Sequence, residues 1–214
     1  MKSESLLTEY LPDSSLRIDP DVAGLEDFPR EFFRLETAHV ARGLIGAWFV
    51  RRYRSKWYGA RIIETEAYLG IEDKAAHSWR GRRTPRVEPM YRDGGHLYVF
   101  LVYGMHSCAN VVTRPPGIPE AVLLRAAEGP EGTPAKLLSG PGRLCAALGI
   151  TVASSGIDLL SGGDIRLFQG TGCDTIGVSK RIGVDYAGEA AEWPLRFFDT
   201  TSRAVSGPAR LRRK

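Results

Sequence analysis

Cysteine is scarce in this sequence, because the 214 residues contain only Cys108, Cys145 and Cys173. These three are widely spaced, and no Cys-x-x-Cys pair or Cys/His cluster accompanies them. Disulfide-stapled domains and zinc sites both need paired or closely spaced ligands, so neither class is indicated. We expect a reducing, intracellular location and no secretion.

Long apolar runs are also lacking. A membrane-spanning helix needs roughly 18–20 continuous apolar residues, and no such stretch occurs. The start, MKSESLLTEYLPDSS, lacks the combination of a basic start and a following apolar run that marks a secretory signal. With 43% hydrophobic residues, the chain can still bury a sizeable core, and its length suits one domain.

Acidic residues are concentrated near the start and sparser afterwards. Residues 1–28 contain two basic and seven acidic side chains, a net charge of −5, whereas the other 186 residues carry +9. A basic body favours polyanionic partners, with nucleic acid first among them. We expect an acidic, flexible leader over residues 1–28, a folded domain over 29–205 and a basic tail over 206–214.

Regular alternation of strands and helices is absent, and so is any internal repeat. Strand-like runs occur at AWFVRRY, ARIIETEAYL, LYVFLVYGM, CANVVT, AVLLRAAEG and IRLFQG. The first two predict a hairpin, and residues 35–45 have helical spacing. SGPGRLCAALGI predicts a helix with Ser139 as N-cap and Pro141 in the first turn. Residues 71–96 have no periodicity and predict a long connection. Together these patterns predict an α+β fold with an antiparallel or mixed sheet.

The stretch IIETEAYLG, residues 62–70, places two carboxylates in apolar surroundings. Alternate residues of a strand point to the same side. Ile62, Glu64, Glu66 and Tyr68 are therefore expected on one side, and Ile63 on the other. Two interpretations remain open: an exposed face with solvated acids paired to arginines, or a general base at the floor of a cleft.

Arg125 and His77 are further candidates for chemistry. Arg125 follows four apolar residues in AVLLRAAEG, and a buried arginine demands a carboxylate or phosphate. A Glu–Arg couple can hold an attacking water, although a structural salt bridge fits equally well. For His77, a loop histidine bonded to backbone is favoured over a metal site with Asp73 and Glu66, because no second His or Cys lies at ligand spacing.

The run SWRGRRTPR is rich in arginine, with Arg80, Arg82, Arg83 and Arg86 in seven residues and no acidic residue among them. Arginine forks match phosphate geometry, so the run fits contact with a nucleic-acid backbone. A solvated, mobile loop fits it equally well.

Three aromatic residues lie close together in LYVFLVYGM. Tyr98 and Phe100 share a strand face, whereas Tyr103 has the opposite parity and precedes Gly104, which permits a tight bend. Ordinary core packing explains most such strands. Beside an arginine-rich loop, the same aromatics suit base stacking or a wedge between base pairs.

Six motifs occur in order along the chain: ETEAYLG, DKAAHSWRGRRTPR, LYVFLVYGMHSCANVV, AVLLRA, SGPGRLCAALGI and RIGVDYAGEAAEWPLRF. Together they resemble the alkyladenine (3-methyladenine) DNA glycosylase family over roughly residues 30–200. The resemblance implies base-excision repair, in which a damaged purine is flipped from duplex DNA and its N-glycosidic bond is hydrolysed. It also implies one compact α+β domain around a curved antiparallel sheet, acting as a monomer on damaged double-stranded DNA without metal, cofactor or membrane. Such an enzyme is expected in the cytoplasm with its nucleoid in a bacterium, or in the nucleus in a eukaryote.

The resemblance also implies residue roles. Glu66 takes the place of the general base, and Arg125 and the backbone carbonyl of Ile182 hold the nucleophilic water. The residues expected to form the base pocket are Tyr68, His77, Phe100 and Asn110, the last crowding the exocyclic amine of guanine. The residues expected at the DNA wedge are Tyr103, Met105 and His106, and those expected on DNA phosphates are Arg80, Arg82, Arg83 and Arg86.

This sequence departs from the family at two of these positions. Phe100 stands where the family commonly has Tyr, so stacking is kept and a hydroxyl is lost. His106 replaces an aromatic residue seen in some relatives. The lesion range therefore stays open: 3-methyladenine is expected, with 7-methylguanine, hypoxanthine and ethenoadenine as further candidates. No lysine lies in the motif, so lyase activity is not expected.

Two other functions remain compatible with the residues. A two-carboxylate sugar hydrolase would use Glu64 and Glu66 as acid and base. A non-enzymatic nucleic-acid-binding protein would rely on the arginine-rich loop and the aromatic strand alone.

Overall fold

The structure is a computed structural model that describes residues 11–19 and 25–207. Its strands are β1 Arg17–Ile18, β2 Trp48–Tyr53, β3 Lys56–Tyr68, β4 Leu97–Val102, β5 His106–Thr113, β6 Glu120–Glu128, β7 Ile165–Phe168, β8 Ile176–Ser179 and β9 Arg196–Asp199. Its α-helices are α1 Arg30–Phe33, α2 Thr37–Gly43 and α3 Pro141–Leu148. Its 3₁₀ turns are η1 Ser14–Leu16, η2 Gly70–Glu72, η3 Trp79–Gly81, η4 Glu88–Tyr91, η5 Ala135–Leu137, η6 Val152–Ser154 and η7 Asp185–Glu192.

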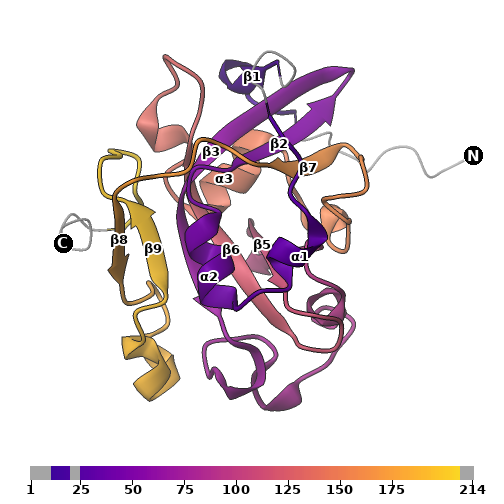
Figure 1. The fold of residues 1–214 in the computed structure, drawn as a ribbon, viewed down its shortest axis with the longest axis vertical. Coiled ribbons are helices and arrows are strands. Elements are labelled where there is room, and N and C mark those ends of the chain that lie inside the picture. Colours follow the sequence, from indigo (N-terminus) through magenta and orange to yellow (C-terminus); the bar gives the residue numbers. More distant parts are fainter. Residues whose placement is uncertain (1–10, 20–24, 208–214) are drawn as a thin grey trace, which may run out of the picture.

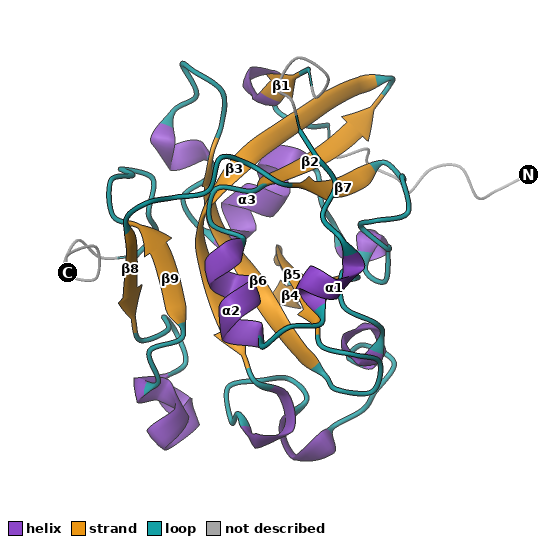
Figure 2. Ribbon diagram, in the orientation of Figure 1, coloured by secondary structure: helices purple, strands orange, loops and turns teal. Residues whose placement is uncertain are grey.

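All described strands belong to one open, antiparallel sheet. The main path runs β4-β5-β6-β3-β2-β7, and β1, β8 and β9 join it beside β3. Figures 1 and 2 show α1 and α2 in front of this sheet, with β8 and β9 standing to one side of β3 and β6. The predicted α+β class with a mainly antiparallel sheet is confirmed, as is the predicted hairpin of β2 and β3.

β3 is the central strand and carries both glutamates of the ETEAY motif. Along one edge it pairs with β6, and along the other it pairs first with β2 and then, at Glu64–Glu66, with β9. Because both edges are hydrogen-bonded where the glutamates sit, their backbone is rigidly held and covered by neighbouring strands. This position makes a precise support for a functional site.

A β-bulge in β3 overturns part of the predicted strand alternation. The register with β6 shifts around Glu64, so that Ile62 faces Ala127 and Glu64 faces Ala126, with Ile63 unpaired between them. Ile62 therefore packs in the main core, and Ile63 packs with Phe198 on the side of the glutamates. A bulge sets two residues against one and shifts the parity by one. The prediction for Ile62 and Ile63 is wrong for this reason, whereas Glu64 and Glu66 do share a side.

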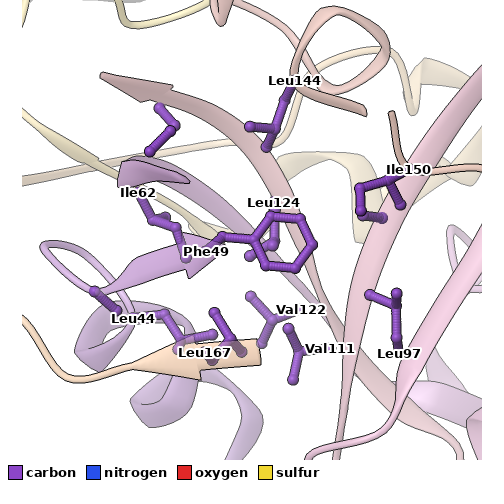
Figure 3. Close-up of a cluster of buried hydrophobic side chains, with 14 of the residues drawn as sticks. Leu44, Phe49, Ile62, Leu97, Val111, Val122, Leu124, Leu144, Ile150 and Leu167 are labelled. Carbon is purple, nitrogen blue, oxygen red and sulfur yellow. The ribbon is translucent and has the colours of Figure 1, made fainter. Parts of the chain in front are cut away.

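The main hydrophobic core fills the space between the sheet and the three helices. Figure 3 shows side chains from distant segments converging there, including Leu44 beside α2, Phe49 of β2, Leu124 of β6 and Leu144 of α3. Each of these four is 0% exposed. Thr65 of β3 also anchors α2, because its hydroxyl donates to the Ala41 carbonyl at 2.8 Å.

Two helix predictions need correction. The predicted helix over residues 35–45 is shorter, because helix α2 begins only at Thr37 and ends at Gly43. Leu35 lies in the non-helical connection between α1 and α2 and is 45% exposed. Ser139 is not the N-cap of α3: Gly140 takes that position with φ +131°, while Ser139 forms a β-bridge with Ala126. A glycine is favoured there because side chains rarely adopt such a φ. Pro141 does open the helix as predicted.

Part of the predicted flexible leader belongs to the fold. Residues 11–19 form η1 and β1, Arg17 pairs with Tyr58 of β3, and Leu16 is 0% exposed within the main core. A buried leucine contributes favourable burial energy, which explains why this segment is docked rather than loose. Residues 1–10 and 20–24 of the leader, and 208–214 of the basic tail, lie outside the described residues. Within the described part, no helix combines the length and apolar character needed to cross a membrane.

Candidate active site

Glu66 lies fully buried at the centre of the predicted site, with 0% exposure. Its Oε1 accepts a hydrogen bond from the backbone N–H of Ile182 at 2.8 Å. Its Oε2 accepts from the Tyr68 hydroxyl at 2.9 Å and from Arg125 Nη1 at 3.3 Å. These donors come from β3, β6 and the segment after β8, so they hold one carboxylate from three separate parts of the chain.

Glu64 is also 0% exposed but has different partners. Its Oε1 accepts from Arg196 Nε at 2.6 Å and from Arg125 Nε at 3.3 Å, and its Oε2 accepts from the Ser206 N–H at 2.6 Å. The interpretation of an exposed strand face with solvated acids is wrong for both glutamates. Glu64 pairs with arginines as a structural carboxylate, whereas Glu66 reaches toward the residues of a cavity.

Arg125 joins the two carboxylates and is 8% exposed. Burial opposes the charged form, but the nearby carboxylates of Glu66 and Glu64 outweigh it and raise the pKa of Arg125. Its guanidinium therefore stays charged and donates to both carboxylates, through Nε to Glu64 and through Nη1 to Glu66. The prediction that this arginine is buried against a carboxylate is confirmed.

A cavity of about 370 Å³ lies over these groups, within the usual size range of small-molecule sites. Its wall contains the predicted pocket residues Tyr68, His77, Phe100, Asn110 and Ile182 together with Arg125. Glu66 itself is not on the wall. It lies one layer behind, hydrogen-bonded to Tyr68, Arg125 and Ile182, all of which are on the wall.

Aromatic rings form one side of the cavity. The His77 ring meets Phe100 edge-on with centroids 4.4 Å apart, and its Nδ1 shares a 2.8 Å hydrogen bond with the Tyr98 hydroxyl. The ring of His77 is therefore held by a side chain rather than by backbone, which corrects the prediction. Burial, followed by the charges of Arg86 and Arg82, lowers the pKa of His77 to about 4. The imidazole is thus neutral near pH 7.

Asn110 of β5 is held rigidly in the same wall. Its Nδ2 donates to the carbonyl oxygens of Tyr98 at 3.1 Å and Cys108 at 3.3 Å, and the residue is 4% exposed. The amide orientation follows from these two bonds. Since both donors point to backbone, Oδ1 is the atom that remains to face an occupant of the cavity.

The predicted wedge residues lie at the turn between β4 and β5. Tyr103 is on the wall of the same cavity, whereas Met105 and His106 line a separate hollow. Tyr103 is 89% exposed and Met105 is 74% exposed, and His106 is also exposed. Tyr103 adopts φ +51° and Gly104 φ +71°. A bulky residue with positive φ is unusual, and such strain concentrates at functional sites. The hairpin therefore presents Tyr103 to solvent although its backbone would suit glycine better.

The four arginines of the SWRGRRTPR run are exposed and have different neighbours. Arg83 forms two hydrogen bonds to Glu88, at 2.7 and 2.8 Å, so an acidic side chain of the protein itself compensates its charge. Arg80 stacks on Trp79 at 4.3 Å, and Arg86 lies over Phe100 at 5.6 Å. Arg82 is exposed. Arg86 therefore joins the loop directly to the aromatic side of the cavity.

Sequence reasoning missed several residues around the site. Arg196 and Ser206 bind Glu64, and a buried ion pair joins Asp73 to Arg181. Arg196 stands among apolar residues in PLRFF, the same signal that identified Arg125. Asp73 is engaged by Arg181, so it does not join His77 and Glu66 in a metal site. In the described part of the chain, no group of three or more His, Cys, Asp or Glu side chains is placed to hold a metal ion.

Comparison with known proteins gives a consistent assignment. A sequence profile of the methylpurine-DNA glycosylase (MPG) family matches residues 31–203. A protein of Desulfitobacterium hafniense (strain Y51) is 45% identical over 196 residues, covering 83% of this chain and 97% of that protein. One of Methanocella arvoryzae is 43% identical over 190 residues (83% and 94%), and one of Bdellovibrio bacteriovorus is 47% identical over 183 (79% and 93%). All three carry the provisional name 3-methyladenine DNA glycosylase.

The family profile spans most of the chain, and the relatives are 43–47% identical. These matches exclude the two alternative functions, a non-enzymatic nucleic-acid binder and a general sugar hydrolase. The chain belongs to the methylpurine-DNA glycosylase family and is a DNA glycosylase, an enzyme of alkylation-damage repair.

Proposed function

We propose that this enzyme excises 3-methyladenine from duplex DNA by flipping the damaged nucleotide into the cavity and hydrolysing its N-glycosidic bond. Other alkylated or deaminated purines are further substrates. The observation that carries the proposal is Glu66, a fully buried carboxylate tied to Arg125 directly behind an aromatic-lined wall. The names of the relatives support 3-methyladenine as substrate.

In the proposed reaction, Glu66 accepts a proton from a water molecule held where Arg125 and Ile182 meet the cavity. The water oxygen bonds to C1′ of the sugar, and the electron pair of the N-glycosidic bond leaves with the purine. The transition state resembles an oxocarbenium ion, as in other glycoside hydrolyses. The negative charge of Glu66 stabilises it. Burial strengthens this interaction, because the local dielectric is low.

The chemistry of the leaving base distinguishes two substrate classes. A 3-methyladenine base is already cationic and departs as a neutral molecule, so it needs no acid. A neutral base such as hypoxanthine needs a proton. His77 is a poor source of it near pH 7, because burial and nearby arginines lower its pKa to about 4. The site therefore suits cationic lesions better than neutral ones.

Selection of the damaged base combines three contributions. A weakly paired base costs less to extrude from the duplex. Tyr68, His77 and Phe100 offer stacking surfaces to an electron-poor purine, with Tyr103 filling the vacated stack. Asn110, held by two backbone carbonyls, cannot turn away easily to admit the exocyclic amine of guanine.

The decisive experiment is Glu66→Gln, which keeps the shape of the side chain and removes its basicity. We expect the single-turnover release of 3-methyladenine from alkylated duplex DNA to fall by roughly 10²–10⁴-fold, the usual contribution of a general base. Affinity for the duplex should stay within about threefold, because no phosphate contact is removed. Chromatography of the freed base and a gel-shift titration measure the two quantities.

Glu31→Gln, an exposed residue of α1, is the matched control and should behave as wild type. Undiminished base release by Glu66→Gln would remove Glu66 from the mechanism. The same chromatography on inosine- and etheno-containing duplexes measures the lesion range.

A further inference from the structure

Asp73 and Arg181 form a fully buried ion pair that has no part in the mechanism above. The guanidinium of Arg181 grips both carboxylate oxygens of Asp73, with Nη2 to Oδ1 at 2.9 Å and a short contact from Nη1 to Oδ2. Both side chains are 0% exposed. Asp73 lies just after η2 and Arg181 just after β8, so the pair joins two otherwise separate segments at the edge of the site.

Each partner also fixes backbone close to the catalytic residues. Asp73 accepts hydrogen bonds from the N–H groups of Leu69 at 3.0 Å and Ala75 at 2.9 Å, which fixes the turn that links Tyr68 to His77. Arg181 donates to the carbonyl of Ala67 at 3.0 Å and to that of Ala190 at 2.8 Å. The pair thus locks the end of β3 to the segment that precedes Ile182.

Two of the three donors that hold Glu66 are neighbours of this pair. The Arg181 guanidinium lies 4.7 Å from the centre of the Tyr68 ring, and the Tyr68 hydroxyl donates to Glu66. Ile182 directly follows Arg181, and its N–H donates to the other oxygen of Glu66. Tyr68 lines the cavity whereas Arg181 does not. Arg181 therefore supports Tyr68 from outside the cavity wall.

Stability alone gives little reason to bury such a pair. The cost of desolvating two charges often cancels their attraction, and apolar residues of similar volume are frequently as stabilising or more so. The planar guanidinium of Arg181, bonded to two backbone carbonyls and a carboxylate, does however fix the relative positions of these groups within a narrow range.

We propose that the Asp73–Arg181 pair positions the Glu66 carboxylate, acting through Tyr68 on one oxygen and through Ile182 on the other. This inference rests on the proposed function, because it assigns Asp73 and Arg181 as positioning residues for the general base. A misplacement of about 1 Å at a catalytic group can lower a rate about 100-fold, so a loosened pair should reduce the rate of base release without removing any group that touches DNA.

The test replaces both charges at once, as Asp73→Leu/Arg181→Met, so that no unpaired charge is left buried. We expect a folded protein by circular dichroism and an affinity for lesion-containing duplex within threefold of wild type. The single-turnover rate of 3-methyladenine release should fall about 100-fold. The matched control is Arg30→Met/Asp158→Leu, which removes another ion pair of 2.6 Å whose residues do not line the cavity. The control should keep its rate.

A double-mutant cycle with Glu66→Gln separates positioning from a general structural role. If the pair acts through Glu66, adding Asp73→Leu/Arg181→Met to Glu66→Gln should lower the residual rate less than threefold. Losses that multiply, or a wild-type rate in Asp73→Leu/Arg181→Met, would overturn the positioning role. The proposed function fails separately, through a fully active Glu66→Gln.

Arg181→Lys keeps the charge and replaces the fork with a single ammonium group. It keeps the inference testable if Asp73→Leu/Arg181→Met does not fold. We expect about a tenfold lower rate at unchanged affinity, and a wild-type rate would overturn the inference.

Discussion

Glu64 and Glu66 lie two residues apart on the same side of β3, but their different hydrogen-bond partners give them different roles. Glu64 binds Arg196, Arg125 and the Ser206 N–H, and Glu66 binds the three wall residues Tyr68, Arg125 and Ile182. The first set links structural segments, whereas the second faces the cavity. A strand presents i and i+2 to one side, so both acids share Arg125 without sharing a role.

The different partners predict different effects when each glutamate is replaced by glutamine. Glu64→Gln removes a buried charge from between two arginines. The free energy of unfolding should therefore fall by about 3–5 kcal/mol, as when one partner of a buried pair is lost. Base release at a temperature where the protein is folded should fall less than in Glu66→Gln. Denaturant titration and single-turnover assays on both variants test the prediction, and an equal loss of rate with no loss of stability in Glu64→Gln would contradict it.

His77 makes the stability of the protein depend on pH. Burial, aided by Arg86 and Arg82, lowers its pKa from 6.5 to about 4. Between these values the unfolded chain binds a proton at this residue and the folded protein does not, so stability falls as the pH drops through that window. The contribution lost between pH 7 and pH 5 is about 2 kcal/mol.

The corresponding experiment compares the wild type with His77→Gln by denaturant unfolding at pH 7 and pH 5. We expect the wild type to lose about 2 kcal/mol more than the variant on acidification. His39, an exposed histidine of α2, provides His39→Gln as a control with the wild-type response. Parallel losses in wild type and His77→Gln would show that His77 does not carry this dependence.

At the scale of elements, the β4–β5 hairpin carries an exposed ring on a strained turn. Tyr103 has φ +51° and no buried contact surface to compensate, since it is 89% exposed. A non-glycine residue in this region costs roughly 1–2 kcal/mol. The hairpin therefore gives up stability at its tip, which fits a side chain retained for contact with DNA rather than for folding.

Substitution at Tyr103 separates the ring from the backbone. Tyr103→Gly should raise the free energy of unfolding by about 1 kcal/mol, because glycine adopts positive φ freely. Both Tyr103→Gly and Tyr103→Ala should weaken binding to lesion-containing duplex more than binding to single-stranded DNA, since the wedge acts only in a stack. Thermal unfolding and gel-shift titrations measure the two effects. Equal losses on duplex and single strand would rule out a wedge.

Local pattern was sufficient to predict most elements but not their irregularities. The β2–β3 hairpin and the run around Arg125 follow from apolar spacing and turn residues, which act over a few positions. The bulge at Ile63 depends on how β6 pairs with β3, and the Arg181–Asp73 bond joins residues 108 positions apart. Ser139 likewise lost its capping role to a bridge with Ala126. Tertiary contacts of this kind cannot be predicted from a short segment of sequence.

At the scale of the whole molecule, the domain boundaries predicted from charge differ from the limits of the packed structure. Charge places residues 1–28 in an acidic leader and residues 206–214 in a basic tail, yet Leu16 lies in the core and Ser206 is 3% exposed beside Glu64. Net charge reports on partners and not on fold. Ser206, which composition alone assigned to the tail, therefore belongs to the hydrogen-bond network of Glu64 beside the site.

The last described residue of the predicted basic tail, Gly207, lies beside a residue of the cavity wall. A side chain at Gly207 would touch Ile182, which lines the cavity, and residues 208–214 then add Arg210, Arg212, Arg213 and Lys214. We expect these four cations to contact phosphates of bound DNA, because arginine and lysine neutralise the nucleic-acid backbone. Such contacts release counterions and make binding sensitive to salt.

Deletion of residues 208–214 should therefore weaken binding to undamaged and damaged duplexes alike. Each phosphate contact contributes about 0.9 to the slope of log affinity against log salt, so a loss of up to about 3–4 in that slope is expected. The single-turnover rate at saturating enzyme should stay within twofold, because Ser206 and the Glu64 network are kept. Arg17→Gln, at the exposed residue of β1, is a control that should leave the slope unchanged. A slope that does not change on deletion would exclude the tail from the DNA interface.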